Sequence, residues 1–183
     1  AEEAHNTLTS SPNNWSITDA GLNVDSCDDI SIPMDIGTGF DYTVSSIIQN
    51  TDNSYLVGGY FDKYQETTAY KIISLNNDGS INNGFTFGVS FFSNYVNKII
   101  LDNTNKQMVV GTFTRKIIRV NQDGSIDNTF NVGTGFNSLC HTIIQDNNGK
   151  YVVGGAFTTY NGITSNRIIR LNQDGSIDNT FNI

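Results

Sequence analysis

Three segments of the chain repeat one another, and this internal repeat limits the fold more than any other feature of the sequence. Each copy carries a DGSI tetrapeptide and closes on a phenylalanine four residues later, and the tetrapeptides begin at residues 78, 123 and 174. They are 45 and 51 residues apart because one loop, YNGITSN in the third copy, is mostly missing from the second. We divide the repeat into units 35–85, 86–130 and 131–181.

Each unit has the pattern of three or four short β-strands. In the third unit we expect strands at 139–145, 151–157 and 167–172, and a short fourth strand at 177–182. The glycine pair Gly154-Gly155 inside the second of these indicates a bulge or a close backbone approach. A period of about 40–50 residues with about four strands per unit is typical of a β-propeller blade.

The DGS tripeptides predict hairpin turns of type I′, for which Asp-Gly is a strong signal. The structural turn residues of the repeat are Asp78, Gly79, Asp123, Gly124, Asp174 and Gly175. Their loops also resemble part of a calcium-binding EF-hand loop, but no frame supplies the bidentate glutamate of such a loop. We therefore expect no cofactor, and a weakly bound calcium in these loops is the alternative.

The composition favours strands and excludes several other classes of protein. The chain has 21 Ile, 19 Thr and 25 Asn against 5 Ala, 3 Glu and 7 Leu, which argues against a helical bundle, a Rossmann domain or a TIM barrel. Its net charge of −8 disfavours nucleic acid as a partner, because phosphate backbones would be repelled. No apolar run approaches the length of a membrane span, so we expect no membrane insertion.

The repeat resembles the delta-60-type β-propeller repeats of bacterial secreted proteins and some phage structural proteins. The stretches that carry the resemblance are GTGFN at 133–137, KYVVGGAFTTYNG at 150–162 and RIIRLNQDGSIDNTFN at 167–182. It covers about residues 35–183 and is weakest in the second unit, where GTGF becomes GVSFF. The resemblance implies a propeller-like fold and neither a settled activity nor catalytic residues.

We therefore predict an all-β chain with three propeller-type blades of about four antiparallel strands each, preceded by an N-terminal arm at 1–34. Propellers typically close with about four to eight blades, so three blades form an incomplete propeller. Two chains could close a six-bladed ring, chains could add head to tail, or the blades could belong to a longer polypeptide. The acidic arm is either poorly ordered or a tether that pairs with a sheet edge of another subunit.

The sequence has no catalytic motif, and we expect that the chain is not an enzyme. Cys140 and His141 look like a reactive pair, but neighbours on a strand point to opposite faces. The repeat aligns Cys140 with valines, which predicts a small buried side chain; a disulfide with Cys27 is the alternative.

Basic residues recur at matching places in the units and are expected to form ion pairs with aspartates of the same or an adjacent blade, such as Asp127 and Asp178. A row of cations for an acidic ligand is the alternative. These basic residues are Lys71, Lys116, Arg119, Arg167 and Arg170.

Aromatic residues outside the repeat pattern are the candidates for contact with a ligand or partner, because exposed rings stack on sugars or bury against proteins. They are Trp15, Tyr60, Tyr64, Tyr70, Phe91 and Tyr160.

The function we expect is structural: a self-associating building block of an extracellular filament, appendage or virion. The alternative is an adhesive or carbohydrate-binding module that acts through the loops at 60–70 and 158–166. An extracellular, virion or cell-surface location is expected because the sequence starts Ala1-Glu2-Glu3 without Met, as a mature exported chain does.

Overall fold

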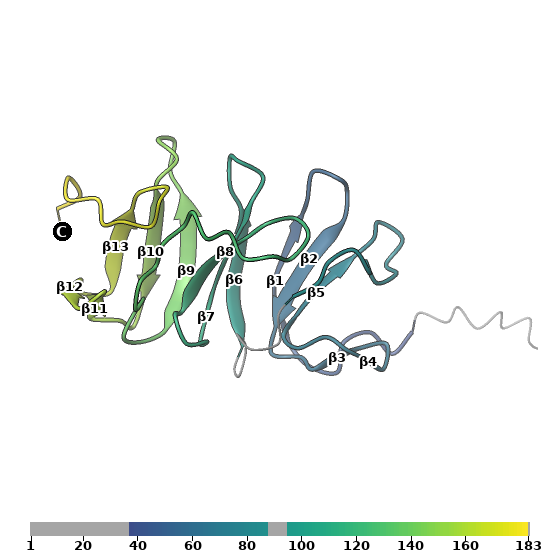
Figure 1. Cartoon of the computed structure of the whole chain (residues 1–183). Helices are drawn as coiled ribbons and strands as arrows, with labels where there is room; N and C mark the ends of the chain where they lie inside the picture. The colour runs from purple at the N-terminus through teal and green to yellow at the C-terminus, as the bar shows by residue number, and fades with distance from the viewer. Residues whose placement is uncertain (1–36, 88–94, 183) are drawn as a thin grey trace, which may run out of the picture. The chain divides into compact units, whose positions relative to one another are not determined.

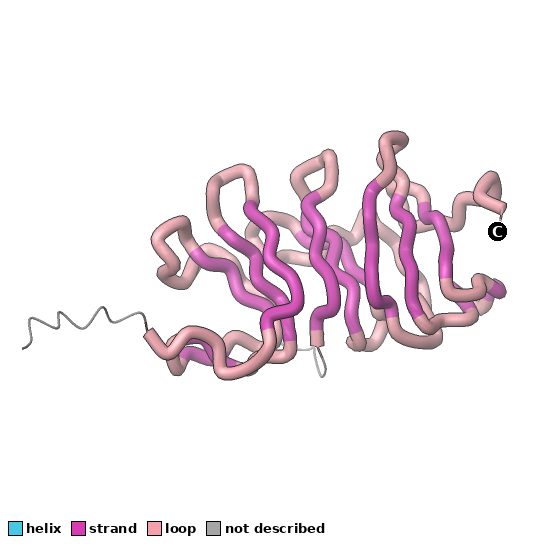
Figure 2. Tube along the Cα trace, turned by 180° about the vertical axis from the view of Figure 1, so that it is seen from behind, coloured by secondary structure: helices cyan, strands magenta, loops and turns pink. Residues whose placement is uncertain are grey.

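The computed structural model describes residues 37–87 and 95–182, which contain thirteen β-strands and no helix (Figure 2). The all-β prediction is confirmed. The N-terminal arm at 1–34 lies outside the described residues. Gly37–Ile183 forms one compact unit.

Each repeat unit forms one antiparallel sheet of three strands, and the sheets follow one another in chain order (Figure 1). The first sheet contains β1 (Val44–Gln49), β2 (Tyr55–Gly59) and β5 (Ile72–Leu75). The second contains β6 (Val96–Leu101), β7 (Gln107–Gly111) and β8 (Ile117–Val120). The third contains β9 (Cys140–Gln145), β10 (Tyr151–Gly155) and β13 (Ile168–Leu171).

Two short hairpins fill the long loops of the first and third units. They are β3 (Lys63–Tyr64) with β4 (Thr67–Thr68), and β11 (Thr159–Tyr160) with β12 (Ile163–Thr164). The second unit has no such hairpin among its described residues, because its loop between β7 and β8 is shorter.

The fourth strand expected at 177–182 is reduced to a single bridge between Leu171 and Ile177, and the other two units have the same bridge. Immediately after it, Asp178 Oδ1 accepts hydrogen bonds from the backbone N–H and the hydroxyl of Thr180. This side-chain turn gives the backbone an alternative to the sheet ladder, and the strand stops.

The close backbone approach expected at the glycine pair is confirmed, and in every unit it lies opposite a bulge in the first strand. Gly59, Gly111 and Gly155 each lie at a register shift, and a Cβ there would overlap a backbone carbonyl oxygen, that of Leu139 in the third unit. The fold therefore requires glycine at this place, whereas the preceding residue is Gly58 in the first unit and Val110 in the second.

The prediction of type I′ turns is wrong. Gly79, Gly124 and Gly175 have φ of +84°, +88° and +88°, but the aspartate before each has a negative φ, and type I′ requires both to be positive. The Gly175 N–H donates to Asn172 O, which makes a type I turn followed by a left-handed glycine. Asp174 Oδ1 accepts hydrogen bonds from the backbone N–H and the hydroxyl of Ser176, so all three residues of the DGS tripeptide take part in the turn.

The sheets stack like blades, with their first strands β1, β6 and β9 next to one another. One hydrophobic cluster joins the first sheet to the second through Leu56, Ile72, Ile99 and Val109. A second cluster joins the second sheet to the third, and it contains Met108 of β7 together with residues of β9, β10 and β13. Most of the core therefore lies between blades.

The predicted ion pairs with Asp127 and Asp178 are confirmed. For Lys116 and Arg167 the expectation is wrong, because among the described residues their side chains donate to the backbone carbonyl oxygens of Thr112 and Ala156 instead. Arg119 Nε donates to Asp127 Oδ2 at 2.8 Å and Arg170 Nε donates to Asp178 Oδ2 at 2.6 Å. Burial disfavours ionisation of Asp127, but hydrogen bonds from Thr129 and Lys106 and the charge of Arg119 hold its pKa well below the usual range. The carboxylate therefore stays charged, and the arginine is fixed against its own blade.

Replacing Asp127→Asn should destabilise the chain by about 3 kcal/mol, because Arg119 would remain buried without its counter-ion. The control is Asp62→Asn, which removes an exposed pair with Lys71 and should cost less than about 1 kcal/mol. Urea unfolding followed by circular dichroism measures both, and equal losses in the two variants would contradict the prediction.

Stability should be constant from neutral pH down to about pH 5 and should fall below about pH 4. Hydrogen bonds from Ser125 and Ser176 lower the pKa of Asp123 and Asp174, and Asp127 is lowered as described above. Because these pKa values are lower in the folded chain, the unfolded chain binds protons at a higher pH than the folded chain does. The stabilisation from these carboxylates is therefore lost as the pH falls through their lowered pKa values. Urea midpoints at pH 7, 5 and 3 test this, and an unchanged midpoint at pH 3 would contradict it.

Candidate functional site

We call the two contacts between neighbouring sheets the inner joints. The face of the first sheet that points away from the second sheet exposes an isoleucine whose counterparts are buried in these joints. Ile47 of β1 aligns with Ile99 and Ile143, and these lie completely buried against the preceding blade. Ile47 itself is 59% exposed. We call the surface formed by Ile47, Tyr55, Val57, Ile73 and Leu75 the N-terminal face.

The opposite surface of the third sheet is open in the same way. Ile144 is 58% exposed, whereas its counterparts Ile48 and Ile100 are half-buried and pack against the following blade. Val152 and Ile168 of the same surface are half-buried, although their counterparts in the first two sheets are buried. We call the surface formed by Ile144, Val152, Gly154, Ile168 and Arg170 the C-terminal face.

Polar side chains bridge each inner joint. Between the second and third sheets, the buried Tyr151 hydroxyl donates to Asp102 Oδ2 at 2.7 Å. Burial and this carboxylate raise the pKa of Tyr151 to about 12. The equivalent contact between the first and second sheets runs from Gln107 Nε2 to Asn50 Oδ1 at 2.9 Å. The joints therefore share a geometry but differ in their chemistry.

An exposed aromatic cluster is the other candidate site. The Tyr60 ring lies 5.1 Å from that of Tyr42 and 5.0 Å from that of Tyr95, measured between centroids. Lys71 Nζ lies 4.9 Å from the centroid of Tyr60 and 2.7 Å from Asp62 Oδ1. A group of partly exposed rings with a cation and a carboxylate at its side has the character of a polyhydroxylated-ligand site.

The aromatic residues selected from the sequence differ in their exposure to solvent. Tyr60 and Tyr70 are exposed, as expected for contact residues. Tyr64 and Tyr160 are buried, and their hydroxyls donate to Gly79 O and Gly175 O, so the expectation of surface contact is wrong for them. Both belong to the short hairpins, which fold back over their own sheets and use the hydroxyl to hold the DGS turn.

Two of the selected aromatic residues, Trp15 and Phe91, lie outside the described residues. Sequence reasoning missed Tyr42, which is 62% exposed and is part of the aromatic cluster. Tyr42 also lies outside the repeat pattern, but it stands two residues before β1 and away from the loops at 60–70 and 158–166 in which contacts were expected.

The expectation for Cys140 agrees with its position in the core. Its side chain is completely buried, and burial raises the pKa of the thiol far above its usual value. His141, the next residue on β9, is exposed. The alternative disulfide involves Cys27, which lies outside the described residues.

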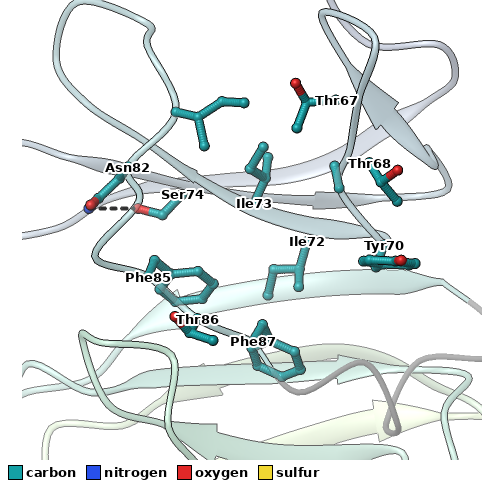
Figure 3. A pocket seen from close by; sticks show the side chains of 12 residues that line it. Thr67, Thr68, Tyr70, Ile72, Ile73, Ser74, Asn82, Phe85, Thr86 and Phe87 are labelled. Carbon is teal, nitrogen blue, oxygen red and sulfur yellow. Dashed lines mark hydrogen bonds between the residues drawn. The ribbon is translucent and has the colours of Figure 1, made fainter.

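Each blade has a cavity at the same place, beside its third strand and the segment that follows the DGS turn. The one in the first unit has a volume of about 230 Å³ and is lined by Ile72, Phe85 and Phe87, with Asn82 hydrogen-bonded to Ser74 at its side (Figure 3). The second and third units have cavities of about 220 and 610 Å³. A hollow that recurs in all three blades follows from the fold and is not specific to one unit.

A β-propeller family of unknown function, DUF5122, has a model that matches residues 51–85, 104–130 and 147–181. The chain belongs to the DUF5122 β-propeller family. The three matched segments fall one in each unit, so the repeat, the three sheets and the family agree. No curated protein matches the sequence.

Several solved structures resemble the chain at low sequence identity. A catalytically inactive virginiamycin B lyase from Staphylococcus aureus, solved with quinupristin, is 17% identical with a TM-score of 0.47, and the match covers 77% of this chain and 42% of the lyase. A protein of unknown function from Bacteroides caccae is 14% identical with a TM-score of 0.40, over 71% of this chain and 42% of that one. The DUF5122 chain thus spans about two fifths of the length of either protein.

Among the described residues, no helix is long and apolar enough to cross a membrane.

Proposed function

We propose that this chain is a structural, non-enzymatic building block that associates with copies of itself through its N-terminal and C-terminal faces, at an extracellular, virion or cell surface. The observation that carries the proposal is the exposure of Ile47 and Ile144, whose counterparts pack against a neighbouring blade at the inner joints. Blades of this kind stabilise one another by burying their faces, so an open face favours a further blade.

The free energy gained by burying an exposed isoleucine supports the proposed self-association. Burying one Ile side chain contributes about 1.5–3 kcal/mol, and each open face offers one exposed isoleucine. Val152 and Ile168 on the C-terminal face and Tyr55 on the N-terminal face are partly buried, whereas Val57, Ile73 and Leu75 are already buried within the first unit. Because the two faces lie on opposite sides of the stack, the same contact can form a ring of chains or a filament.

Ile144→Asp should lower the native mass of the assembled chain to that of a monomer, because a carboxylate on the C-terminal face would be buried unpaired. Light scattering on a sizing column measures the mass. The control is Tyr70→Asp, which changes an exposed residue away from both faces and should leave the mass unchanged. A wild-type chain that is monomeric at high concentration would contradict the proposed function.

A second function, binding of carbohydrate at a surface, is favoured by the aromatic cluster of Tyr42, Tyr60 and Tyr95. The central ring, Tyr60, is in contact with both others and with Lys71, so a sugar ring could stack on the cluster while its hydroxyls meet Lys71 and Asp62.

For this second function, we expect the wild-type chain to bind members of a glycan array and Tyr60→Ala to lose about tenfold or more in affinity for the same glycans. Tyr70→Ala removes an exposed ring outside the cluster and should bind as the wild type does. Titration calorimetry with the best-bound oligosaccharide measures the three affinities. Absence of any bound glycan would contradict the carbohydrate function and leave self-association unaffected.

A further inference from the structure

We propose that the C-terminal face of one copy receives the N-terminal face of a second copy in the register of the inner joints, with Tyr55 of one chain bonded to Asp146 and Arg170 of the other. This inference rests on the proposed self-association and names the contact that would carry it. It predicts a head-to-tail joint rather than a contact between like faces.

The polar groups on the C-terminal face repeat those of the second sheet. Asp102 Oδ1 accepts from the backbone of Thr104 and Lys106, which leaves Oδ2 to accept the hydroxyl of Tyr151 across the joint. Asp146 Oδ1 accepts from the backbone of Asn148 and Lys150 in the same way. Among the described residues, the contact of Asp146 Oδ2 is with Arg170 Nη1, at 3.6 Å. The carboxylate is therefore placed to accept a hydroxyl that the described part of its own chain does not supply.

Arg170 repeats the role of Arg119. Arg119 uses Nε and Nη2 within its own unit and sends Nη1 across the joint, 2.7 Å from Gln173 O and 3.4 Å from the Tyr151 hydroxyl. Arg170 also uses Nε and Nη2 within its unit, on Asp178 and Thr180. Its Nη1 lies 3.6 Å from Asp146 Oδ2, and by analogy with Arg119 it would donate to the next blade.

The N-terminal face supplies the missing partners. The repeat aligns Tyr55 with Tyr151, and among the described residues its hydroxyl contacts Asn77 Oδ1 at 3.4 Å. Asn77 aligns with Gln173, so its carbonyl oxygen stands where Arg170 Nη1 would donate. Tyr55 is half-buried, whereas Tyr151 is completely buried.

The apolar parts of the C-terminal and N-terminal faces also have complementary shapes. Between the first two sheets, a Cβ on Gly58 would meet Val96 and Ile99 at 2.6–2.8 Å, so these side chains sit directly on the glycine. Gly154 has the same place on the C-terminal face, and a Cβ there would meet only Thr142 and the backbone of its own unit, at 3.2 Å or more. The exposed Ile47, the counterpart of Ile99, fits this open place.

The direction of the joint is tested by mixing two blocked chains. Ile47→Asp blocks the N-terminal face and Ile144→Asp blocks the C-terminal face, so each variant alone should remain monomeric. Mixed at equal concentration they should form a 1:1 complex through the one intact pair of faces, as measured by light scattering. Association of either variant with itself would overturn the head-to-tail joint, and so would a mixture that stays monomeric while the wild type assembles.

The polar contact is tested by Tyr55→Phe and Asp146→Asn, which keep the size of the side chains. Each should weaken association by about tenfold to a hundredfold, because a hydrogen bond to a charged group is lost at a buried joint. Tyr42→Phe is the control, since that ring contacts Tyr60 rather than the N-terminal face. Wild-type assembly with unchanged affinity in both variants would overturn this inference alone, whereas a monomeric wild type would overturn the proposed function as well.

Discussion

The burial of one blade against the next is the interaction on which the rest of this structure depends. The main sheets have three strands of four to six residues, too small for each to enclose a core of its own. Ile99 and Ile143 are completely buried because a preceding sheet covers them, and Ile47, which has the same place in the repeat, is not. The stability of each blade therefore includes its neighbours, as in other repeat proteins.

Apolar contact alone would allow blades to slide, and the polar groups in the joints restrict the register. The Tyr151 hydroxyl and the Asp102 carboxylate are both buried, so a shifted register would leave both without partners. The first joint is less fully satisfied, because Gln107 Oε1 has no hydrogen-bond partner among the described residues. The joints thus combine a common apolar packing with polar contacts that differ from one to the next.

The sequence predicted those features that the repeat alignment expresses directly. Blade number, the close backbone approach at Gly155 and the Arg119–Asp127 ion pair all follow from residues that recur at matching places. The turn type could not be read in this way, because Asp-Gly suits both a type I′ turn and a type I turn with a left-handed glycine. Ser176, whose backbone N–H donates to Asp174 Oδ1, belongs to the type I turn with a left-handed glycine. The burial of Tyr160 depends on a hairpin folding back over its sheet, which residue type and loop position do not reveal.

The differences between the repeats give the blades an order. The C-terminal side of the first sheet carries Asn50 and Ser74 and meets Gln107, whereas the second sheet carries Asp102 and Arg119 and meets Tyr151. A tyrosine placed on the first sheet would find no arginine, and a glutamine placed on the second would leave the arginine without its hydroxyl. The third sheet repeats the chemistry of the second, and of the three units only the first and third carry the tyrosine that matches it. These polar differences make the pairing specific, because a wrong neighbour would leave buried groups unpaired. They therefore allow similar units to stack in one order.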